Sequence, residues 1–188
     1  MQKLIVLNCP PRSGKDTIAE LFVHRDHYKM LSFKDKLINI ALMISNVERE
    51  LWEARYQTHK DVPWRRLGGL TQREYLIKIS EEWIKPVHGK SYFGNIIAED
   101  VVASQGVDRF ILPDGGFKEE IEPLWKMLGR GVLIIQWERE GCSFNIDSRK
   151  WITTYPHITV KVKPNNGTIE EHYQEVKRVI HEHFGEEI

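Results

Sequence analysis

Residues 3–22 of this 188-residue chain, KLIVLNCPPRSGKDTIAELF, place a strand, a loop and a helix in immediate succession. Leu4 to Leu7 form a compact apolar run, which is typical of a strand buried on both faces. Pro, Arg, Ser and Gly then form a loop, and Ile18, Leu21 and Phe22 give the following helix its apolar positions. This order predicts a phosphate-binding loop, because backbone N–H groups and a helix N-terminus together attract an anion.

Six consecutive residues are the expected nucleotide contacts: Arg12, Ser13, Gly14, Lys15, Asp16 and Thr17. Gly14 lets the backbone approach a phosphate, and the Lys15 ammonium can bridge the outer phosphates as charge shifts during transfer. The loop departs from G-x-x-x-x-G-K-[ST], because Cys9 replaces the first glycine and Asp16 replaces the magnesium-binding Ser or Thr. Either Asp16 or Thr17 is expected to contact magnesium. The alternative is an ordinary β-turn-α loop that happens to contain Gly-Lys.

Composition and charge exclude several classes of protein. Charged residues make up 29 % and hydrophobic residues 41 %, as in a globular domain rather than a disordered chain. Lys plus Arg and Asp plus Glu each number 27, and this zero net charge argues against a nucleic-acid binder that relies on bulk charge. Cys9 and Cys142 are too few for a disulfide framework, and no apolar run suits a membrane span or a signal peptide. We therefore expect a cytoplasmic protein with no membrane partner.

Strands and helices alternate along the chain. The expected strands cover residues 3–8, 28–32, 109–113, 132–137 and 157–162. The expected helices lie at about residues 15–23, 33–44, 71–85, 92–102, 117–128 and 169–184. Thr71 and Thr168 each begin a capping box, Pro86 is expected to stop the helix that Thr71 opens, and residues 48–69 are the least regular stretch. The alternation predicts an α/β fold with a parallel sheet between two layers of helices.

Ligands of such sheets bind beyond the carboxyl ends of the strands, where several charged residues fall. Asp114 is the candidate Walker-B-like carboxylate for magnesium, and the alternative is a turn-forming Asp before Gly-Gly. Asp35 is the candidate general base, and the alternative is an Asp that the helix dipole favours in a first turn. Arg139 and Arg149 bracket a lid-like loop at about residues 138–150 and could neutralise the transferred phosphoryl group, unless they are surface residues.

A basic segment, residues 55–66, carries a local net charge of +3, because four Arg and Lys side chains oppose one Asp. Tyr56 and Trp64 are interleaved with these charges. The segment is either a solvated loop or a surface that contacts phosphate or nucleic acid.

Three segments resemble motifs of phage deoxynucleoside monophosphate kinases, in the same order: SGKDT at residues 13–17, MLSFKDKL at 30–37 and FILPD at 110–114. The resemblance implies a P-loop NTPase fold of the nucleotide-kinase type. It also implies a phosphotransferase that uses ATP and Mg²⁺. That family typically has an Arg after the acidic residue of its third motif, whereas Gly115 follows Asp114 here.

Other segments look like a related phage group, the 5-hydroxymethyluracil DNA kinases. These segments are residues 73–74, 80–82, 85–86, 89–90, 92–94, 114–117, 141–142 and 147–149. This resemblance implies that ATP phosphorylates the hydroxymethyl group of 5-hydroxymethyluracil in phage DNA, in the host cytoplasm. Within a single kinase domain, residues 45–90 or so would form a helical insertion that binds the acceptor. The alternatives are a deoxynucleoside monophosphate kinase, which makes dNDP from dNMP, and a non-catalytic nucleotide-binding protein.

Overall fold

The computed structural model of the chain describes residues 1–145 and 147–185. The chain divides into two compact units, the first formed by Met1–Ser32 with Gly94–Ile188 and the second by Phe33–Phe93. Among the described residues, no helix combines the length and the apolar character that crossing a membrane requires.

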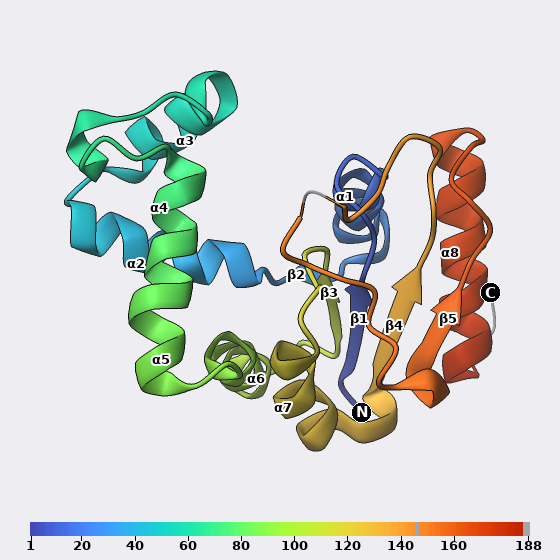
Figure 1. The fold of residues 1–188 in the computed structure, drawn as a ribbon. Coiled ribbons are helices and arrows are strands. Elements are labelled where there is room, and N and C mark those ends of the chain that lie inside the picture. Colours follow the sequence, from blue (N-terminus) through green and yellow to red (C-terminus); the bar gives the residue numbers. More distant parts are fainter. Residues whose placement is uncertain (146, 186–188) are drawn as a thin grey trace. The chain divides into compact units, whose positions relative to one another are not determined.

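Five parallel strands form the sheet of the first unit, in the order β2-β3-β1-β4-β5 (Figure 1). They are β1 (Lys3–Leu7), β2 (Lys29–Met30), β3 (Arg109–Leu112), β4 (Val132–Gln136) and β5 (Thr159–Lys161). The central strand β1 pairs with β3 through Ile5 and Ile111, and with β4 through Ile5 and Leu133. Leu4 to Leu7 are fully buried, as expected for a strand that helices cover on both faces.

Four long helices cover this sheet: α1 (Lys15–Asp26), α6 (Tyr92–Ala103), α7 (Lys118–Leu128) and α8 (Ile169–Phe184). One face packs against α1 and α8, where Phe22 and Tyr173 join the side chains of the strands. On the other face α7 contacts β4, and Gly94 of α6 lies so close to Glu120 of α7 that a Cβ would meet its carbonyl at 2.3 Å. Short 3-10 turns cover Gly129–Gly131 and Pro156–Ile158. These layers confirm the predicted α/β/α fold.

The second unit is helical. It contains α2 (Phe33–Ser45), α3 (Arg49–His59), a 3-10 turn (Arg65–Leu67), α4 (Gln72–Lys78), a π-helical stretch (Ile79–Ile84) and α5 (Lys85–His88). Trp52 and Ile79 are fully buried at the centre of its apolar cluster. Gln72 Nε2 donates to the Trp52 carbonyl at 2.9 Å and so joins α4 to α3.

Two of the local predictions are wrong. Residues 48–69 are not irregular throughout, because α3 occupies much of them; Trp52 is the one buried residue of that helix, so no apolar stripe reveals it. Pro86 does not stop the helix, because it falls in the first turn of α5, where a missing N–H is tolerated. Both predicted capping boxes, at Thr71 and Thr168, are confirmed.

Candidate functional site

The candidate phosphate loop connects β1 to α1. Gly14 is the N-cap of α1 in the left-handed conformation, with φ 90°, and no side chain caps this helix among the described residues. Arg12 also has a positive φ, of 65°, and Ser13 N donates to the Pro10 carbonyl at 3.3 Å. The loop is therefore a tight turn that leaves the first N–H groups of a 12-residue helix without a capping side chain. Such a helix end attracts a phosphate.

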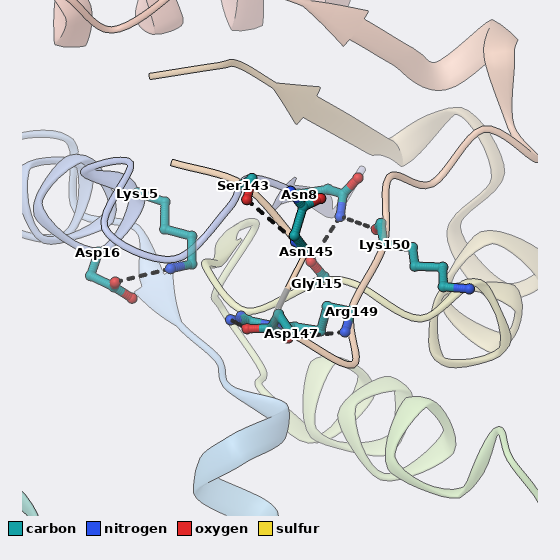
Figure 2. A network of polar contacts seen from close by, with 9 residues as sticks. All are labelled: Asn8, Lys15, Asp16, Gly115, Ser143, Asn145, Asp147, Arg149 and Lys150. Atoms are coloured by element: carbon teal, nitrogen blue, oxygen red, sulfur yellow. Dashed lines mark hydrogen bonds and ion pairs between the residues drawn. The ribbon is translucent and has the colours of Figure 1, made fainter. Parts of the chain in front are cut away.

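Ser13 and Lys15 supply polar groups inside this loop. Ser13 Oγ is buried and has no hydrogen-bond partner among the described residues. Buried polar groups normally have a partner, so this hydroxyl is available to a ligand. The Lys15 side chain is only 6 % exposed, and its Nζ lies 3.2 Å from Asp16 Oδ2 (Figure 2). Because the Asp16 side chain is 71 % exposed, water screens this ion pair and a nucleotide phosphate can compete for the ammonium.

Asp114 lies in the turn after β3. Its Oδ2 accepts a hydrogen bond from Ser32 Oγ at 2.8 Å. Ser32 follows β2, and β2 pairs with β3, so the loops after two neighbouring strands meet at the carboxyl edge of the sheet. An ionised carboxylate has about four acceptor sites, so a serine hydroxyl and a magnesium ion, or its water, can share it.

Asn8 is the centre of a buried network that joins three loops of this edge (Figure 2). Its Nδ2 donates to the Gly115 carbonyl at 3.0 Å and to the Lys150 carbonyl at 2.9 Å. Its Oδ1 accepts from Gln136 Nε2 at 2.7 Å and from Ile152 N at 2.8 Å. All four hydrogen-bonding positions of the amide are thus used, and the turn after β3 and the chain near residue 150 are held against β1.

Arg149 makes a double ion pair with Asp147, from Nε to Oδ1 at 2.9 Å and from Nη2 to Oδ2 at 2.7 Å (Figure 2). The aliphatic part of its side chain lies over Gly116, and a Cβ placed on Gly116 would come within 2.4 Å of Arg149 Cβ. Burial opposes the charge, but the Asp147 contact and the fields of Asp114 and Asp16 outweigh it and raise the pKa of Arg149. The fold therefore brings Arg149 under the influence of two predicted site carboxylates.

Arg139 and the phosphate loop border a cleft of about 500 Å³ in the first unit. Arg139 is exposed, and its Nη1 would lie 3.6 Å from a Cβ placed on Gly14. The cleft is also lined by Pro10, Phe144, Trp151, Pro164 and Asn166. It thus combines aromatic surface with one arginine and two carboxylates, Glu138 and Glu140, and lies directly beside the loop that would hold a phosphate.

Asp35 belongs to the second unit, in the first turn of α2. Its Oδ1 accepts from Arg49 Nη1 at 3.1 Å, and the same Nη1 lies 3.0 Å from Glu53. These side chains are at least one-third exposed, so the network contributes little stability. The assignment of Asp35 as a general base stays a prediction.

The basic segment, residues 55–66, is partly used for local structure. Arg55 Nη2 donates to the Pro63 carbonyl at 3.2 Å, and its guanidinium lies 4.9 Å from the centre of the Trp64 ring. Trp64 in turn packs against the buried Trp52. Lys60, Arg65 and Arg66 are exposed, so they are the basic residues of the segment that a partner could contact.

The donors for magnesium are few. The described residues contain no group of three or more His, Cys, Asp or Glu side chains that could hold a metal. Of the predicted contacts, Asp16 and Thr17 are exposed and Asp114 is half-buried. Mg²⁺ in phosphoryl-transfer sites uses one or two carboxylates together with phosphate oxygens and water. The donor set therefore fits Mg²⁺ as a companion of a bound nucleotide.

Sequence reasoning missed Asn8, Ser32 and Gln136. A signal for two of them was present, since Asn8 and Gln136 are polar residues at the ends of otherwise apolar strands. Buried amides need partners, so such residues indicate a hydrogen-bonded network at that end of the sheet. Ser32 begins a polar stretch, residues 32–36, after the second expected strand, which indicated its place at this edge but not its hydrogen bond to Asp114.

No protein-family model and no curated protein sequence matches the chain. Among solved structures, a gluconokinase from Sinorhizobium meliloti 1021 is 14 % identical, with 97 % of this chain and 95 % of that chain covered and a TM-score of 0.49. A dephospho-CoA kinase from Campylobacter jejuni is 16 % identical, with 98 % and 99 % covered and a TM-score of 0.48. Likeness at this level carries no argument about substrate or activity.

Proposed function

We propose that the chain is a P-loop kinase that transfers the γ-phosphate of ATP to a hydroxyl group. The observation that carries the proposal is the buried Lys15 directly after Gly14, at an uncapped helix N-terminus that follows the central strand. Phosphoryl transfer needs little covalent chemistry from a protein. It needs positioned phosphates and cations that neutralise the charge developing on the transferred group.

Each charged group at this edge has a role in the proposal. The α1 N-terminus and the buried Ser13 hydroxyl would hold phosphate oxygens, and Lys15 would leave Asp16 to bridge the outer phosphates. Mg²⁺, held by Asp114 with Asp16 or Thr17, would supply charge neutralisation between the phosphates. Arg149 carries a guanidinium, which stays protonated in proteins, so it would remain a cation throughout the reaction.

The nucleoside of ATP would occupy the cleft of about 500 Å³ beside Pro10. Its volume falls within the range of small-molecule sites, and Phe144 and Trp151 offer apolar surface to a base. Arg139, at the border of cleft and loop, would lie between the nucleoside and the phosphates.

For the acceptor we propose the hydroxymethyl group of 5-hydroxymethyluracil in DNA. An alcohol must lose its proton during attack, so the reaction benefits from a carboxylate base, and Asp35 is the candidate. The exposed Arg65 and Arg66 support a DNA acceptor, because exposed arginines contact backbone phosphates. The zero net charge favours a second candidate, a deoxynucleoside monophosphate kinase, because a small acceptor needs no broad basic surface.

An acceptor panel tests the proposal. The chain is incubated with γ-labelled ATP and Mg²⁺ and with hydroxymethyluracil duplex DNA, plain duplex DNA, dTMP or dGMP. We expect label in the modified DNA alone. Label in a nucleoside diphosphate would establish the second candidate, and ATP binding without transfer to any acceptor would show a nucleotide-binding protein.

A further inference from the structure

The main-chain carbonyl of Ser13, inside the phosphate loop, accepts two side-chain hydrogen bonds. Trp137 Nε1 donates to it at 3.1 Å, and Asn165 Nδ2 donates at 2.8 Å. The two donors come from separate segments, since Trp137 directly follows β4 and Asn165 lies beyond β5. All three residues are buried, with exposures of 0 % for Ser13, 1 % for Trp137 and 8 % for Asn165.

This carbonyl belongs to the same peptide group as the N–H of Gly14. A trans peptide is planar, so its C=O and N–H point in opposite directions, and the described residues contain no cis peptide. A carbonyl fixed toward Trp137 and Asn165 therefore fixes the Gly14 N–H on the side away from both. In a phosphate loop the N–H groups must face the anion, whereas a carbonyl turned toward it would repel it.

Gly14 is the residue at which this peptide can turn over most easily. Glycine adopts positive and negative φ at similar cost, and Gly14 has φ 90°. Rotation of the peptide changes mainly ψ of Ser13 and φ of Gly14, so no Cβ at Gly14 resists it. A Cβ there would also lie 2.8 Å from Asn165 Nδ2, so the loop cannot be stiffened by a larger residue without displacing that donor.

The two donors are themselves held in place. The Trp137 ring packs edge-to-face on His172, with ring centres 4.7 Å apart and planes at 74°. Asn165 N donates to the Glu138 carbonyl at 2.8 Å, which fixes the backbone that carries the side-chain amide. Groups whose own positions are fixed by packing and hydrogen bonds can hold a binding loop in one orientation.

We propose that Trp137 and Asn165 are positioning residues that hold the Ser13–Gly14 peptide with its N–H available to the nucleotide phosphates. The inference rests on the proposed function, because it names what keeps that loop competent. Either hydrogen bond alone still orients the carbonyl, so the two act redundantly. Loss of both frees the peptide to turn, and affinity for phosphates falls while affinity for the nucleoside does not.

The test compares Trp137→Phe, Asn165→Ala and the double variant with the unchanged chain. Phenylalanine keeps an aromatic ring against His172 and removes the N–H donor together with one ring of the indole. Trp125→Phe and Asn95→Ala make the same chemical changes at α7 and at an exposed position of α6, and serve as matched controls. Calorimetry gives Kd for ATP, inorganic triphosphate and adenosine, and melting curves report the fold.

We expect each single variant to raise the Kd of ATP about 3-fold and the double variant about 30-fold or more, which exceeds the product of the single effects. Triphosphate should follow ATP, and adenosine should bind all variants equally. Both affinities are measured on the same preparation, so the ratio of ATP affinity to adenosine affinity does not depend on the fraction of the chain that fails to fold. An unchanged ratio in the double variant would overturn the inference. Failure of the unchanged chain to bind ATP and triphosphate would instead overturn the proposed function.

Discussion

The side-chain amide of Asn8 donates to the Gly115 carbonyl at 3.0 Å, so the end of the central strand directly holds the turn that carries Asp114. The same amide holds the Lys150 carbonyl, next to Arg149. Two candidate catalytic groups from distant parts of the sequence are thus positioned by one residue that touches neither of their side chains in this network.

Asn8→Asp should lower both stability and phosphate transfer. The substitution keeps the size of the side chain but removes the donors to Gly115 and Lys150, and it places a carboxylate against two carbonyl oxygens. A buried acceptor left unsatisfied costs about 1–3 kcal/mol. Urea unfolding and the rate of phosphate transfer measure the two effects. Asn95→Asp, on the exposed face of α6, should change neither; an Asn8→Asp chain as stable and active as the unchanged one would refute the positioning role.

Asp35→Asn should suppress turnover far more than ATP binding. A general base contributes about 100- to 10,000-fold to rate, whereas Asp35 is not among the predicted ATP contacts. Glu53→Gln is the matched control, because Glu53 is the other carboxylate that Arg49 contacts. Turnover and ATP affinity are measured on both variants. If ATP affinity collapses while turnover per bound ATP survives, Asp35 is a binding or structural residue.

Replacing Arg65 and Arg66 together by Ala should flatten the salt dependence of binding to modified duplex DNA. Each lost phosphate contact removes about 0.9 from the slope of log K against log salt, so the pair removes about 2. The KM for DNA should rise with little change in kcat, since such contacts act equally on ground and transition states. Arg73→Ala with Lys90→Ala removes two exposed charges of the same unit outside the basic segment and should leave the slope unchanged. A slope unchanged by the Arg65 and Arg66 substitutions would place the DNA surface elsewhere.

Acidification should destabilise the protein through His172. Burial against Trp137 lowers the pKa of His172 from its ordinary value of 6.5 to about 4. Between these values the unfolded chain binds the proton and the folded chain does not, so the free energy of unfolding falls as pH drops from about 6.5 toward 4. His172→Phe, which keeps a ring against Trp137, should show a smaller loss over this interval. Equal losses for the two chains, measured by urea unfolding, would contradict the buried neutral imidazole.

The fold class could be predicted from the sequence, but not every element of the fold. The apolar run Leu4 to Leu7 and the Gly-Lys loop identify β1, α1 and the phosphate loop, because these features are local. The polar helix α3 could not be predicted, because it has no apolar stripe. Trp52 is its one buried residue. Packing between distant segments overrides a weak local pattern.

The candidate site, like the fold, could be predicted from the sequence only in part. The loop residues and Asp114 follow directly from strand ends, which a sequence pattern locates. The partners of those residues do not, since Trp137 and Asn165 reach the Ser13 carbonyl across 124 and 152 positions of the chain. Hydrogen bonds at such separations depend on the folded sheet and leave no periodic signal.

Transfer of labelled phosphate from ATP to hydroxymethyluracil DNA by the unchanged chain, Lys15→Ala and Lys118→Ala tests the central claim most directly. Lys118 is an exposed lysine at the start of α7 and serves as the matched control. The account predicts normal transfer with Lys118→Ala and a loss of about 100- to 1,000-fold or more with Lys15→Ala, at an unchanged melting temperature. Near-normal transfer by a folded Lys15→Ala chain would contradict the phosphate-loop assignment.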